Sequence, residues 1–459
     1  MPVLFLLITT AQSLLFQADR PISQPASVML TAYSTTLIAN GEDRTSLRIV
    51  LIDSLSQEIA GRWDSVRVYV SGDARITTAD GNLIEMHADT TGAYGACRLH
   101  DGVLNLALIA GTQADKVKVE ARSGTLWPGA HEIHTLPRTF QYQQPSPAQL
   151  PVTGTSIGRM IGADISWLPQ LEARGRTFYE GDHSIDAVTL LQKHGFNTIR
   201  LRIFVNPENE KGYSPNDGFC DLAHTLEMAQ RVKAAGMQLL LDFHYSDFWA
   251  DPQQQYKPER WADLDFSSLQ DSIQAYTAYV LNQLIAQGTP ADMVQIGNEI
   301  NHGILWPDGH ISNPDQLAAL LQAGVQGTRS AMPGVPVMMH IALGGQNQEA
   351  VFWLDNMLAR GVTFDIIGLS YYPRWHGTLT DLKANLQDLV NRYHKPVNVV
   401  EYSDFKREVH DAVFALPDGM GKGACIWEPL NRRSGLFDAE GHVTGLIGVY
   451  DHLHSTYLE

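Results

Sequence analysis

The most constraining feature of this sequence is a regular alternation of apolar runs and amphipathic helical stretches that begins near residue 152. Eight apolar runs of about five to eight residues are each followed by a stretch with helical periodicity. The runs are apolar almost without interruption, which is typical of strands that are covered on both faces. Eight such units in about 300 residues predict an α/β fold of the (β/α)₈ TIM-barrel type over residues 152–459.

The elements expected in this region can be given by residue number. The expected strands are 162–166, 198–204, 238–245, 293–299, 335–343, 365–373, 397–403 and 423–429. The expected helices are 185–194, 222–235, 267–287, 314–330, 348–360, 379–394, 406–416 and 444–457. A doubly wound sheet is the alternative, and it is disfavoured because no glycine-rich phosphate turn follows any strand.

Residues 26–140 have a different pattern, made of short strands and turns. The expected strands, rich in β-branched residues and often alternating, are 28–33, 46–52, 65–70 and 116–121. Turn signals lie between such runs at Asn40-Gly41, Asp80-Gly81 and Asp101-Gly102. With no convincing long helix, this region predicts a small all-β sandwich. Residues 37–43 resemble bacterial Ig-like modules, and residues 141–151, rich in Gln, Pro and Ser, predict a linker.

Residues 1–18 are mostly apolar, which suits the h-region of a secretory signal but is too short for a membrane span. No Lys or Arg precedes the run, so a mis-started or truncated N-terminus is the alternative. Export is the expectation, to a secreted, periplasmic or bacterial cell-surface location. No other stretch approaches the roughly 18 apolar residues of a spanning helix, so no membrane span is expected.

The composition excludes some partners. Lys and Arg number 33 against 50 Asp and Glu, a formal net charge of −17. Such an acidic surface repels phosphate backbones, so neither nucleic acid nor an anionic membrane is an expected partner. Three widely spaced cysteines, Cys97, Cys220 and Cys425, form no disulfide framework and contain no C-x-x-C pair. Cys425 lies in an expected strand, where a small apolar filler is its expected role.

The expected strands end in residues that carry chemistry, and in a barrel these ends line the active site. Glu299 ends the fourth strand and Glu401 ends the seventh, so they would lie on roughly opposite sides of the barrel mouth. A single glutamate at a strand end more often forms a salt bridge or caps a helix. Here, however, the other strand ends also carry His, Arg, Tyr, Trp and acidic residues. Glycoside hydrolysis needs two facing carboxylates, about 5–5.5 Å apart for retention and farther apart for inversion.

Six stretches between residues 162 and 438 carry recognisable motifs. They are Gly162–Ser166, Gly195–Arg202, Leu241–Pro252 with its His-Tyr-Ser-Asp-Phe-Trp-Ala-Asp-Pro run, Val294–Ile300, Ser370–Gly377 and Trp427–Pro429. Together they resemble glycoside hydrolase family 53, the endo-β-1,4-galactanases of clan A. The resemblance implies that Glu299 is the acid/base and Glu401 the nucleophile of a retaining, double-displacement mechanism. It implies further that Arg200, with Tyr372 or Tyr371, stabilises the nucleophile.

The same resemblance suggests roles for other strand-end residues. Asn298 would donate to the sugar 2-hydroxyl, a contact that strengthens in the transition state. The remaining candidates would shape the sugar sites (His244, His340), stack on sugar rings (Trp249, Trp375, Trp427) or bond hydroxyl groups along the cleft (Asp164, Asp247). Each histidine and tryptophan could instead belong to the core. No cofactor and no metal are expected.

The segment after Glu401 departs from the family pattern. Only about twenty residues separate Glu401 from the eighth strand, which leaves no room for the calcium-binding loop of some bacterial members. We therefore expect an open cleft, fewer subsites and no calcium.

The expected substrate is the β-1,4-galactan side chain of pectin, cleaved by a monomer. A clan A hydrolase of mannan or xylan and a non-catalytic glycan-binding barrel are the alternatives. The sandwich is expected to act as a spacer, with glycan binding or tethering as its other options.

Overall fold

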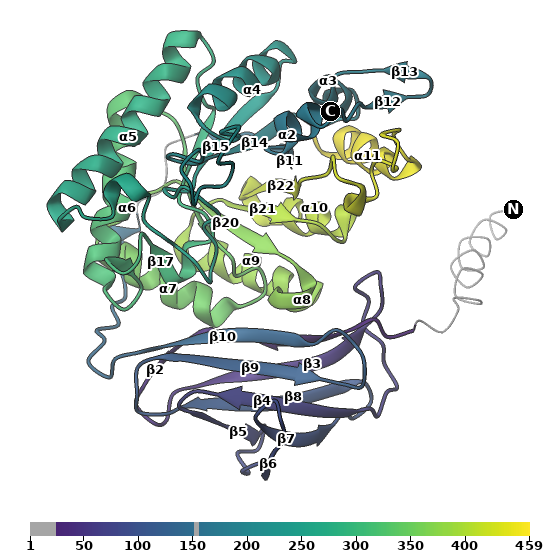
Figure 1. Cartoon of the computed structure of the whole chain (residues 1–459), viewed down its shortest axis with the longest axis vertical. Helices are drawn as coiled ribbons and strands as arrows, with labels where there is room; N and C mark the ends of the chain where they lie inside the picture. The colour runs from purple at the N-terminus through teal and green to yellow at the C-terminus, as the bar shows by residue number, and fades with distance from the viewer. Residues whose placement is uncertain (1–23, 151–155) are drawn as a thin grey trace, which may run out of the picture.

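The computed structural model describes residues 24–150 and 156–459, which form an all-β part stacked beneath an α/β barrel (Figure 1). The apolar run at residues 1–18, in which the sequence predicts a signal, lies outside the described residues. Residues 152–155, at the start of the predicted barrel region, also lie outside them. Among the described residues, no helix is long and apolar enough to cross a membrane.

The barrel is a closed sheet of eight parallel strands in chain order. Its strands are β11 (Met160–Asp164), β14 (Thr198–Ile203), β15 (Gln238–Phe243), β16 (Met293–Ile296), β19 (Val337–Ile341), β20 (Ile366–Tyr371), β21 (Val397–Tyr402) and β22 (Gly421–Trp427). β22 pairs with β11, which closes the sheet and excludes the doubly wound alternative. The predicted (β/α)₈ fold is confirmed.

Helices follow the strands and cover the outside of the barrel (Figure 1). The main helices are α3 (Ala187–Lys193), α4 (Leu222–Ala234), α5 (Phe266–Gln287), α6 (Pro314–Ala331), α7 (Asn347–Ala359), α9 (Leu379–Tyr393), α10 (Lys406–Phe414) and α11 (Gly448–Tyr457). Shorter elements occupy the connections: α2 (Leu168–Ala173), α8 (Pro373–His376) and the hairpins β12–β13 (Tyr179–Glu180, His183–Ser184) and β17–β18 (Gly303–Ile304, Gly309–His310). Several helices begin where a side chain caps them, as Asp265 does by accepting from the Ser268 amide on α5.

The interior of the barrel is divided along its axis. The end nearest the strand starts is filled by an apolar cluster that contains Met160, Leu240, Met293, Met338, Ile366, Val400 and Cys425. Cys425 is fully buried there, in agreement with its predicted role as a filler. The strand ends instead carry buried polar side chains. This division places the polar chemistry at the carboxyl-terminal mouth of the barrel.

Two sheets pack face to face in the all-β part. One sheet has the order β1 (Ser27–Ala32), β3 (Arg44–Ile52), β8 (Val103–Ala110), β5 (Ala74–Thr78). The other has the order β2 (Thr36–Ile38), β10 (Gly129–Leu136), β9 (Lys116–Arg122), β4 (Ser65–Ser71), β7 (Ala93–Arg98), β6 (Met86–Ala88). Val28, Leu47, Val66 and Val119 are among the alternate residues that fill the space between the sheets. The predicted turn glycines Gly41, Gly81 and Gly102 all adopt positive φ.

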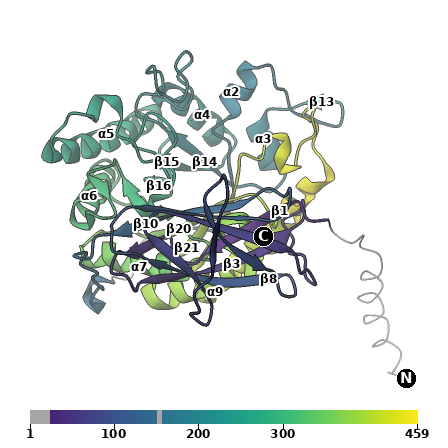
Figure 2. The same ribbon diagram turned by 60° about the horizontal axis from the view of Figure 1, so that its bottom comes forward.

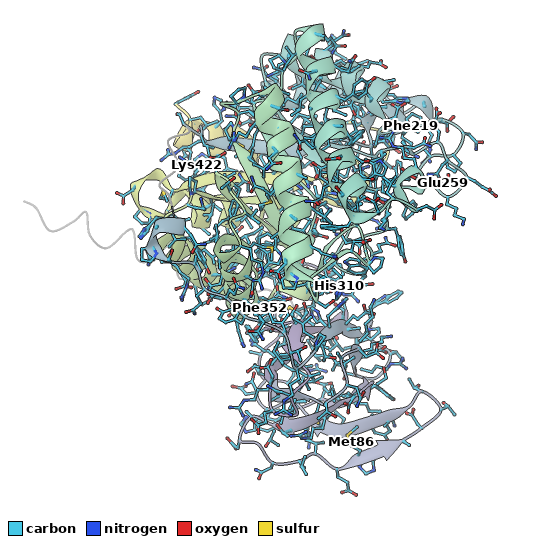
Figure 3. All side chains as sticks on the ribbon, turned by 90° about the vertical axis from the view of Figure 1, so that its left-hand side faces the viewer. Met86, Phe219, Glu259, His310, Phe352 and Lys422 are labelled. Atoms are coloured by element: carbon cyan, nitrogen blue, oxygen red, sulfur yellow. The ribbon has the colours of Figure 1, made fainter. Side chains whose placement is uncertain are left out.

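The sandwich presents β10 to the barrel, on the side of α7 and α8 (Figures 1 and 2). Figure 3 shows His310 and Phe352 at the junction, whereas Met86 lies at the far end of the sandwich. Glu349 of α7 is buried in the junction and accepts hydrogen bonds from the Thr35 hydroxyl at 2.8 Å and the Thr36 hydroxyl at 2.9 Å. These contacts join the two parts through buried, charge-assisted hydrogen bonds.

The predicted linker is attached to the barrel along part of its length. It contains η1 (Pro147–Gln149), and the Gln149 amide donates to the Ala359 carbonyl at 2.7 Å. The Arg360 guanidinium donates to the Gln141 carbonyl at 2.9 Å. The segment with a linker-like composition is therefore packed against the end of α7.

The predicted barrel strands are longer than the observed ones by one to three residues at several ends. The clearest case is β16, which ends at Ile296 although the apolar pattern predicts a strand to residue 299. Gly297 has φ 77° and Glu299 has φ 48°, so the chain turns away from the sheet here. A non-glycine residue in the left-handed region costs about 1–2 kcal/mol, and such strain gathers at functional sites.

Candidate active site

The two predicted carboxylates lie at the mouth of the barrel. Glu401 is in β21, and Glu299 follows the turn after β16. Both line each of two cavities, one of about 340 Å³ and one of about 160 Å³. The pair thus lies where the two cavities meet. Each carboxylate has a different set of neighbours, and this difference decides what each can do.

Arg200, in the middle of β14, is the centre of the charged network. It is buried, and its guanidinium donates to Glu401 Oε2 at 3.1 Å and to Asn298 Oδ1 at 2.8 Å. It also donates to Asp164 at 2.9 Å and to Asp242 at 2.8 Å. All these groups come from strand ends that are adjacent in the barrel or lie across it. The planar, multidentate guanidinium suits such a site, because it binds several acceptors in fixed directions.

Tyr372 is the second partner of Glu401. Its hydroxyl donates to Glu401 Oε1 at 2.7 Å, so both oxygens of the carboxylate are bonded to donors. Tyr371 is buried away from the pair and donates to the Gly377 carbonyl at 3.3 Å. Of the two tyrosines left open by the sequence, the structure therefore places Tyr372 beside Glu401.

Burial raises the pKa of both glutamates, and by more for Glu299. The pKa of Glu299 lies well above its usual value because of burial first and repulsion by Glu401 second. A hydrogen bond from the Ser370 hydroxyl at 2.6 Å opposes that rise. The pKa of Glu401 is also raised by burial, but Arg200 and the Tyr372 hydroxyl favour its charged form. Glu299 therefore holds a proton in conditions where Glu401 is ionised.

Asn298 is held in one orientation beside the pair. Its Oδ1 accepts from Arg200, and its Nδ2 donates to the Ala250 carbonyl at 2.9 Å. His340 Nδ1 lies 2.9 Å from Asn298 Oδ1, and His340 Nε2 lies 2.8 Å from the Ser370 hydroxyl. His340 is fully buried and lines neither cavity. His340 thus lies behind the site as a positioning residue. It contacts Asn298 directly and Glu299 through the Ser370 hydroxyl.

Aromatic side chains form one wall of the smaller cavity. Trp249 and Trp427 line it together with His244. The guanidinium of Arg202 lies 4.2 Å from the Trp249 ring centroid and forms an ion pair with Glu428 at 2.8 Å. Such rings, held in place by a buried cation, can stack on the apolar face of a sugar.

Two predicted hydroxyl-binding aspartates are placed differently from the expectation. Asp164 lines the smaller cavity, but its carboxylate is bonded to Arg200 and to the Ser166 hydroxyl at 2.7 Å. Asp247 lines neither cavity, and its carboxylate accepts from the backbone amides of Asn206 and Glu259, each at 2.8 Å. The carboxylate of Asp247 therefore orders the loop after β15, and the position of Asp164 makes it a support for Arg200.

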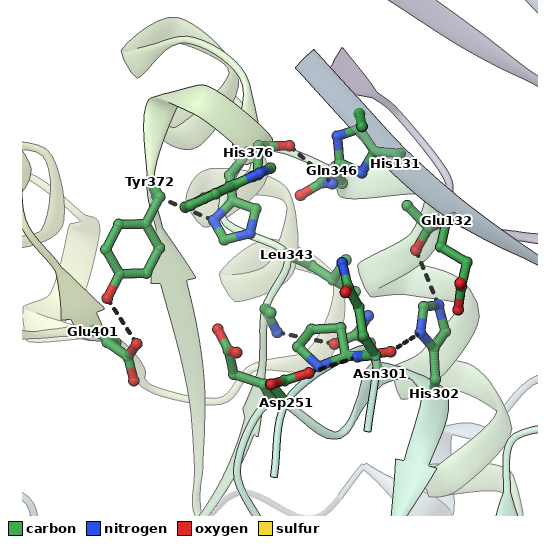
Figure 4. A pocket seen from close by; sticks show the side chains of 17 residues that line it. His131, Glu132, Asp251, Asn301, His302, Leu343, Gln346, Tyr372, His376 and Glu401 are labelled. Carbon is green, nitrogen blue, oxygen red and sulfur yellow. Dashed lines mark hydrogen bonds between the residues drawn. The ribbon is translucent and has the colours of Figure 1, made fainter. Parts of the chain in front are cut away.

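The larger cavity has a composition that the sequence did not indicate. Its lining includes Trp375 and other residues of the barrel connections, but also Thr35, Ala130, His131 and Glu132 of the sandwich. Figure 4 shows His131 and Glu132 facing the same space as Tyr372 and Asn301. β10 therefore forms part of the cavity wall, a feature that the expectation of a spacer did not include. No local pattern in the sandwich, such as an aromatic strip, marks these residues.

Other residues of the site were also missed. Trp167 packs against Trp427 with ring centroids 5.0 Å apart, and its amide donates to Glu428 at 3.0 Å. Ser370 and Gln346 also contribute polar atoms to the site. Trp167 and Ser370 lie within or directly after matched motifs, so a closer inspection of the strand ends could have found them. Gln346 follows a glycine pair after the fifth strand and carries no such signal.

No group of three or more His, Cys, Asp or Glu side chains in residues 24–150 and 156–459 has an arrangement that could hold a metal ion. The predicted absence of calcium stays a prediction. The segment between β21 and β22 contains α10 and the short η4 (Pro417–Gly419).

A closed (β/α)₈ barrel with two differently tuned carboxylates at its mouth, beside a cluster of aromatic rings, defines the class of barrel glycoside hydrolases. Within that class the family is shown by sequence. The family model described as "Glycosyl hydrolase family 53" matches residues 160–430. The chain belongs to glycoside hydrolase family 53, as its motifs led us to expect.

Individual relatives agree with this assignment. An "uncharacterized protein in bgaB 5′region" from Niallia circulans is 43% identical over 312 residues, covering 59% of this chain and 83% of that protein. A "probable arabinogalactan endo-beta-1,4-galactanase A" from Aspergillus tubingensis is 37% identical over 261 residues, covering 55% of this chain and 72% of that protein. The solved GH53 catalytic domain of Ignisphaera aggregans matches 66% of this chain and 98% of its own length, with a TM-score of 0.60 and 30% identity.

Proposed function

We propose that this protein is an endo-acting β-1,4-galactanase that cleaves galactan with retention of configuration. The observation that carries the proposal is the unequal environment of Glu299 and Glu401 in a family 53 barrel. The galactanase name of a relative that is 37% identical supports the substrate class.

In the first step, ionised Glu401 attacks the anomeric carbon and forms a covalent glycosyl-enzyme, while Glu299 donates its proton to the departing glycosidic oxygen. In the second step, Glu299 takes a proton from water, and the resulting hydroxide oxygen displaces Glu401 from the anomeric carbon. The Glu299 proton is thereby restored, and the configuration is inverted twice. Arg200 and Tyr372 hold the nucleophile in its ionised form and aim its two oxygens.

Asn298 and the aromatic wall would act on the sugar that bonds to Glu401. The second Nδ2 proton of Asn298 is free to donate to the 2-hydroxyl, a contact that strengthens as the ring approaches an oxocarbenium ion. Trp249 and Trp427 would stack on apolar sugar faces in the smaller cavity.

The proposal is tested with Glu299→Ala and Glu401→Ala on a purified linear β-1,4-galactan. We expect the rate to fall about 10²–10⁴-fold for Glu299→Ala, because the acid/base proton transfer is lost. A comparable or larger loss is expected for Glu401→Ala, which lacks the nucleophile. Glu408→Ala, an exposed position on α10, is the matched control and should keep its activity.

Azide distinguishes the two roles. With an activated aryl galactobioside, azide should react with the glycosyl-enzyme of Glu299→Ala and give the β-glycosyl azide. In Glu401→Ala, azide should enter in place of the nucleophile and give the α-glycosyl azide. Undiminished galactan hydrolysis by either variant would contradict the proposal. Hydrolysis by the wild type of mannan or xylan in place of galactan would favour the alternative substrates.

Three finer points are part of the same proposal. The polymer attacked would be the galactan side chain of pectin, the protein would be exported by a bacterium, and the sandwich would be of the Ig-like type. The net charge of −17 of the whole protein is compatible with a neutral polymer as substrate, because binding such a polymer needs no electrostatic steering.

A further inference from the structure

The cavity of about 340 Å³ between the sandwich and the barrel has four properties of a binding site. It opens directly onto Glu299 and Glu401, and its volume lies within the range of about 300–1,000 Å³ that is usual for ligand pockets. Trp375 lines it with a ring that remains 43% exposed. The fourth property is an unpaired polar atom.

That atom is Oε1 of Gln346. The side chain is only 2% exposed and lines the cavity, and Oε1 has no hydrogen-bond partner among the described residues. The orientation of the amide is set by its other end, because Nε2 donates to the carbonyls of Ala32 and Trp375, each at 3.3 Å. Figure 4 shows the Gln346 amide between His131 and His376 at the upper side of the cavity. A buried acceptor without a partner is costly, so it is ready to accept from a ligand hydroxyl.

The sandwich contributes to this arrangement directly. The Ala32 carbonyl that helps to orient Gln346 belongs to β1, and Ala130 and His131 of β10 form the facing wall. The wall is held in place on the barrel, since Arg374 donates to the Pro128 carbonyl at 2.8 Å. The Thr35–Glu349 hydrogen bond provides a second attachment.

The two cavities can be assigned to opposite ends of the cleaved bond. Asn298 and Arg200 line only the smaller cavity, so the sugar that bonds covalently to Glu401 would lie there. The larger cavity shares Glu299, Glu401 and Asp251 with the smaller one and is otherwise lined by different residues. It therefore receives the part of the polymer that departs when Glu299 donates its proton.

We propose that the sandwich and the barrel together form a binding site for the leaving-group end of the galactan chain. Gln346 Oε1 accepts a sugar hydroxyl there, Trp375 offers a stacking surface, and β10 bounds the far side. This inference rests on the proposed galactanase function and adds to it a role for the sandwich in substrate binding.

The test uses full-length variants on each side of the cavity. Ala130→Trp fills part of the larger cavity from the sandwich side. Gln346→Met removes the hydrogen-bond acceptor on the barrel side with little change in side-chain volume. Ala88→Trp, at the exposed edge strand β6 at the far end of the sandwich, is the matched control. The substrate is linear β-1,4-galactopentaose with heavy oxygen at its reducing-end carbon, so that mass spectrometry identifies which bond is cleaved.

We expect both cavity variants to move cleavage toward the reducing end, so that fewer sugar units leave on that side. We also expect kcat/KM on the pentaose to fall by about three- to tenfold, the effect of a lost hydrogen bond or of weaker contacts. On an aryl galactobioside, whose leaving group is a single ring, Gln346→Met should lower kcat/KM by a smaller factor than it does on the pentaose. Ala88→Trp should behave as the wild type on both substrates.

Two results would have different meanings. An active wild type with an unchanged cleavage position and kcat/KM in both Ala130→Trp and Gln346→Met would overturn the inference alone. A wild type that cleaves no β-1,4-galactan would refute the proposed function and, with it, the inference. Because Gln346→Met does not alter the sandwich sequence, a folding defect confined to Ala130→Trp leaves the second variant to test Gln346, the acceptor that the Ala32 carbonyl of the sandwich helps to orient.

Discussion

The two cavities beside Glu299 and Glu401 differ in how they are built. The smaller one belongs to the barrel alone and is lined by charged and aromatic groups, with Arg200 and Arg202 fully buried in ion pairs. The larger one is shared by two parts of the molecule, and its lining combines neutral polar, carboxylate and apolar side chains with one exposed tryptophan, Trp375. Its shape depends on the junction around Glu349.

This difference separates the chemistry from the choice of substrate. The side that must stabilise charge in the transition state is held rigidly by a network in which removing one member leaves other buried charges unpaired. The other side only has to bind sugar units as they depart. The wall that β10 of the sandwich supplies to the larger cavity can therefore change without disturbing the reacting groups. The predictions below test this separation, from the largest expected effect to the smallest.

Replacing the centre of the barrel-side network should have the largest effect. Arg200→Lys cannot satisfy Glu401, Asn298 and the two aspartates together, so we expect kcat on galactan to fall about 10²–10³-fold. Arg231→Lys, on α4 in a partly exposed ion pair, is the control and should stay within about twofold. A normal kcat for Arg200→Lys would contradict the proposed difference between the two cavities, because the network around Arg200 would then have no role in the chemistry.

Removing the carboxylate at the junction should affect stability. Glu349→Leu leaves the Thr35 and Thr36 donors buried without acceptors, so we expect a loss of about 2–4 kcal/mol in the free energy of unfolding, measured by urea denaturation. The exposed Glu408→Leu should change it by less than about 0.5 kcal/mol.

The effect of Glu349→Leu on the free energy of unfolding should depend on pH. Burial alone would raise the pKa of Glu349 in the folded protein, but the interaction with His302 and the hydrogen bonds from Thr35 together outweigh burial and lower this pKa. A lowered folded-state pKa stabilises the protein above the unfolded value of about 4.3, and this contribution is lost as the pH falls through the folded value. The stability difference between wild type and Glu349→Leu should therefore narrow at acidic pH. A stability difference between wild type and Glu349→Leu that widens on acidification would contradict a lowered pKa for Glu349.

Tyr372→Phe should reduce kcat by about 10- to 100-fold, because Glu401 loses one of its two donors. The hydroxyl lowers the pKa of Glu401, so its removal raises that pKa and should move the acidic limb of the pH–rate profile to higher pH. Tyr371→Phe is the matched control, since its hydroxyl donates only to the Gly377 carbonyl, and its pH profile should be that of the wild type. A shift with Tyr371→Phe and none with Tyr372→Phe would reverse the assignment.

Ser370→Ala should have the smallest effect. The Ser370 hydroxyl opposes the raised pKa of Glu299, so its loss should raise that pKa further. The alkaline limb of the pH–rate profile is then expected to move to higher pH by less than about one unit, with kcat within about tenfold. Movement of this limb to lower pH would show that the hydroxyl holds the proton on Glu299.

The barrel could be predicted from the sequence because its strands are local patterns. Each apolar run is near-continuous, and the order of strands in a parallel barrel follows the order along the chain. Strand ends were less predictable, since an apolar pattern does not show that Gly297 and Glu299 turn out of the sheet. The motif resemblance identified Glu299 and Glu401 because family motifs are also local.

The motif resemblance implied Arg200 beside Glu401, but the roles of Asp164 and Asp247 and the wall of the second cavity could not be predicted in the same way. Thr35 and Glu349, which join the sandwich to the barrel, are 314 residues apart. Asp164 and Asp247 have the residue type of sugar-binding groups, but their partners are an arginine and backbone amides supplied by other segments. Such partners depend on which segments meet in space, and a single sequence does not reveal this.

By itself, the sequence determined the closed barrel, the preceding sandwich and the two strand-end glutamates, since periodicity and strand-end position are properties of short segments. Only the tertiary structure decided which tyrosine reaches Glu401, and that Asp164 supports an arginine. It also decided that the sandwich forms a wall of the cleft. These outcomes arise from packing between distant segments, where hydrogen bonds and buried surfaces select one arrangement among many that local patterns allow.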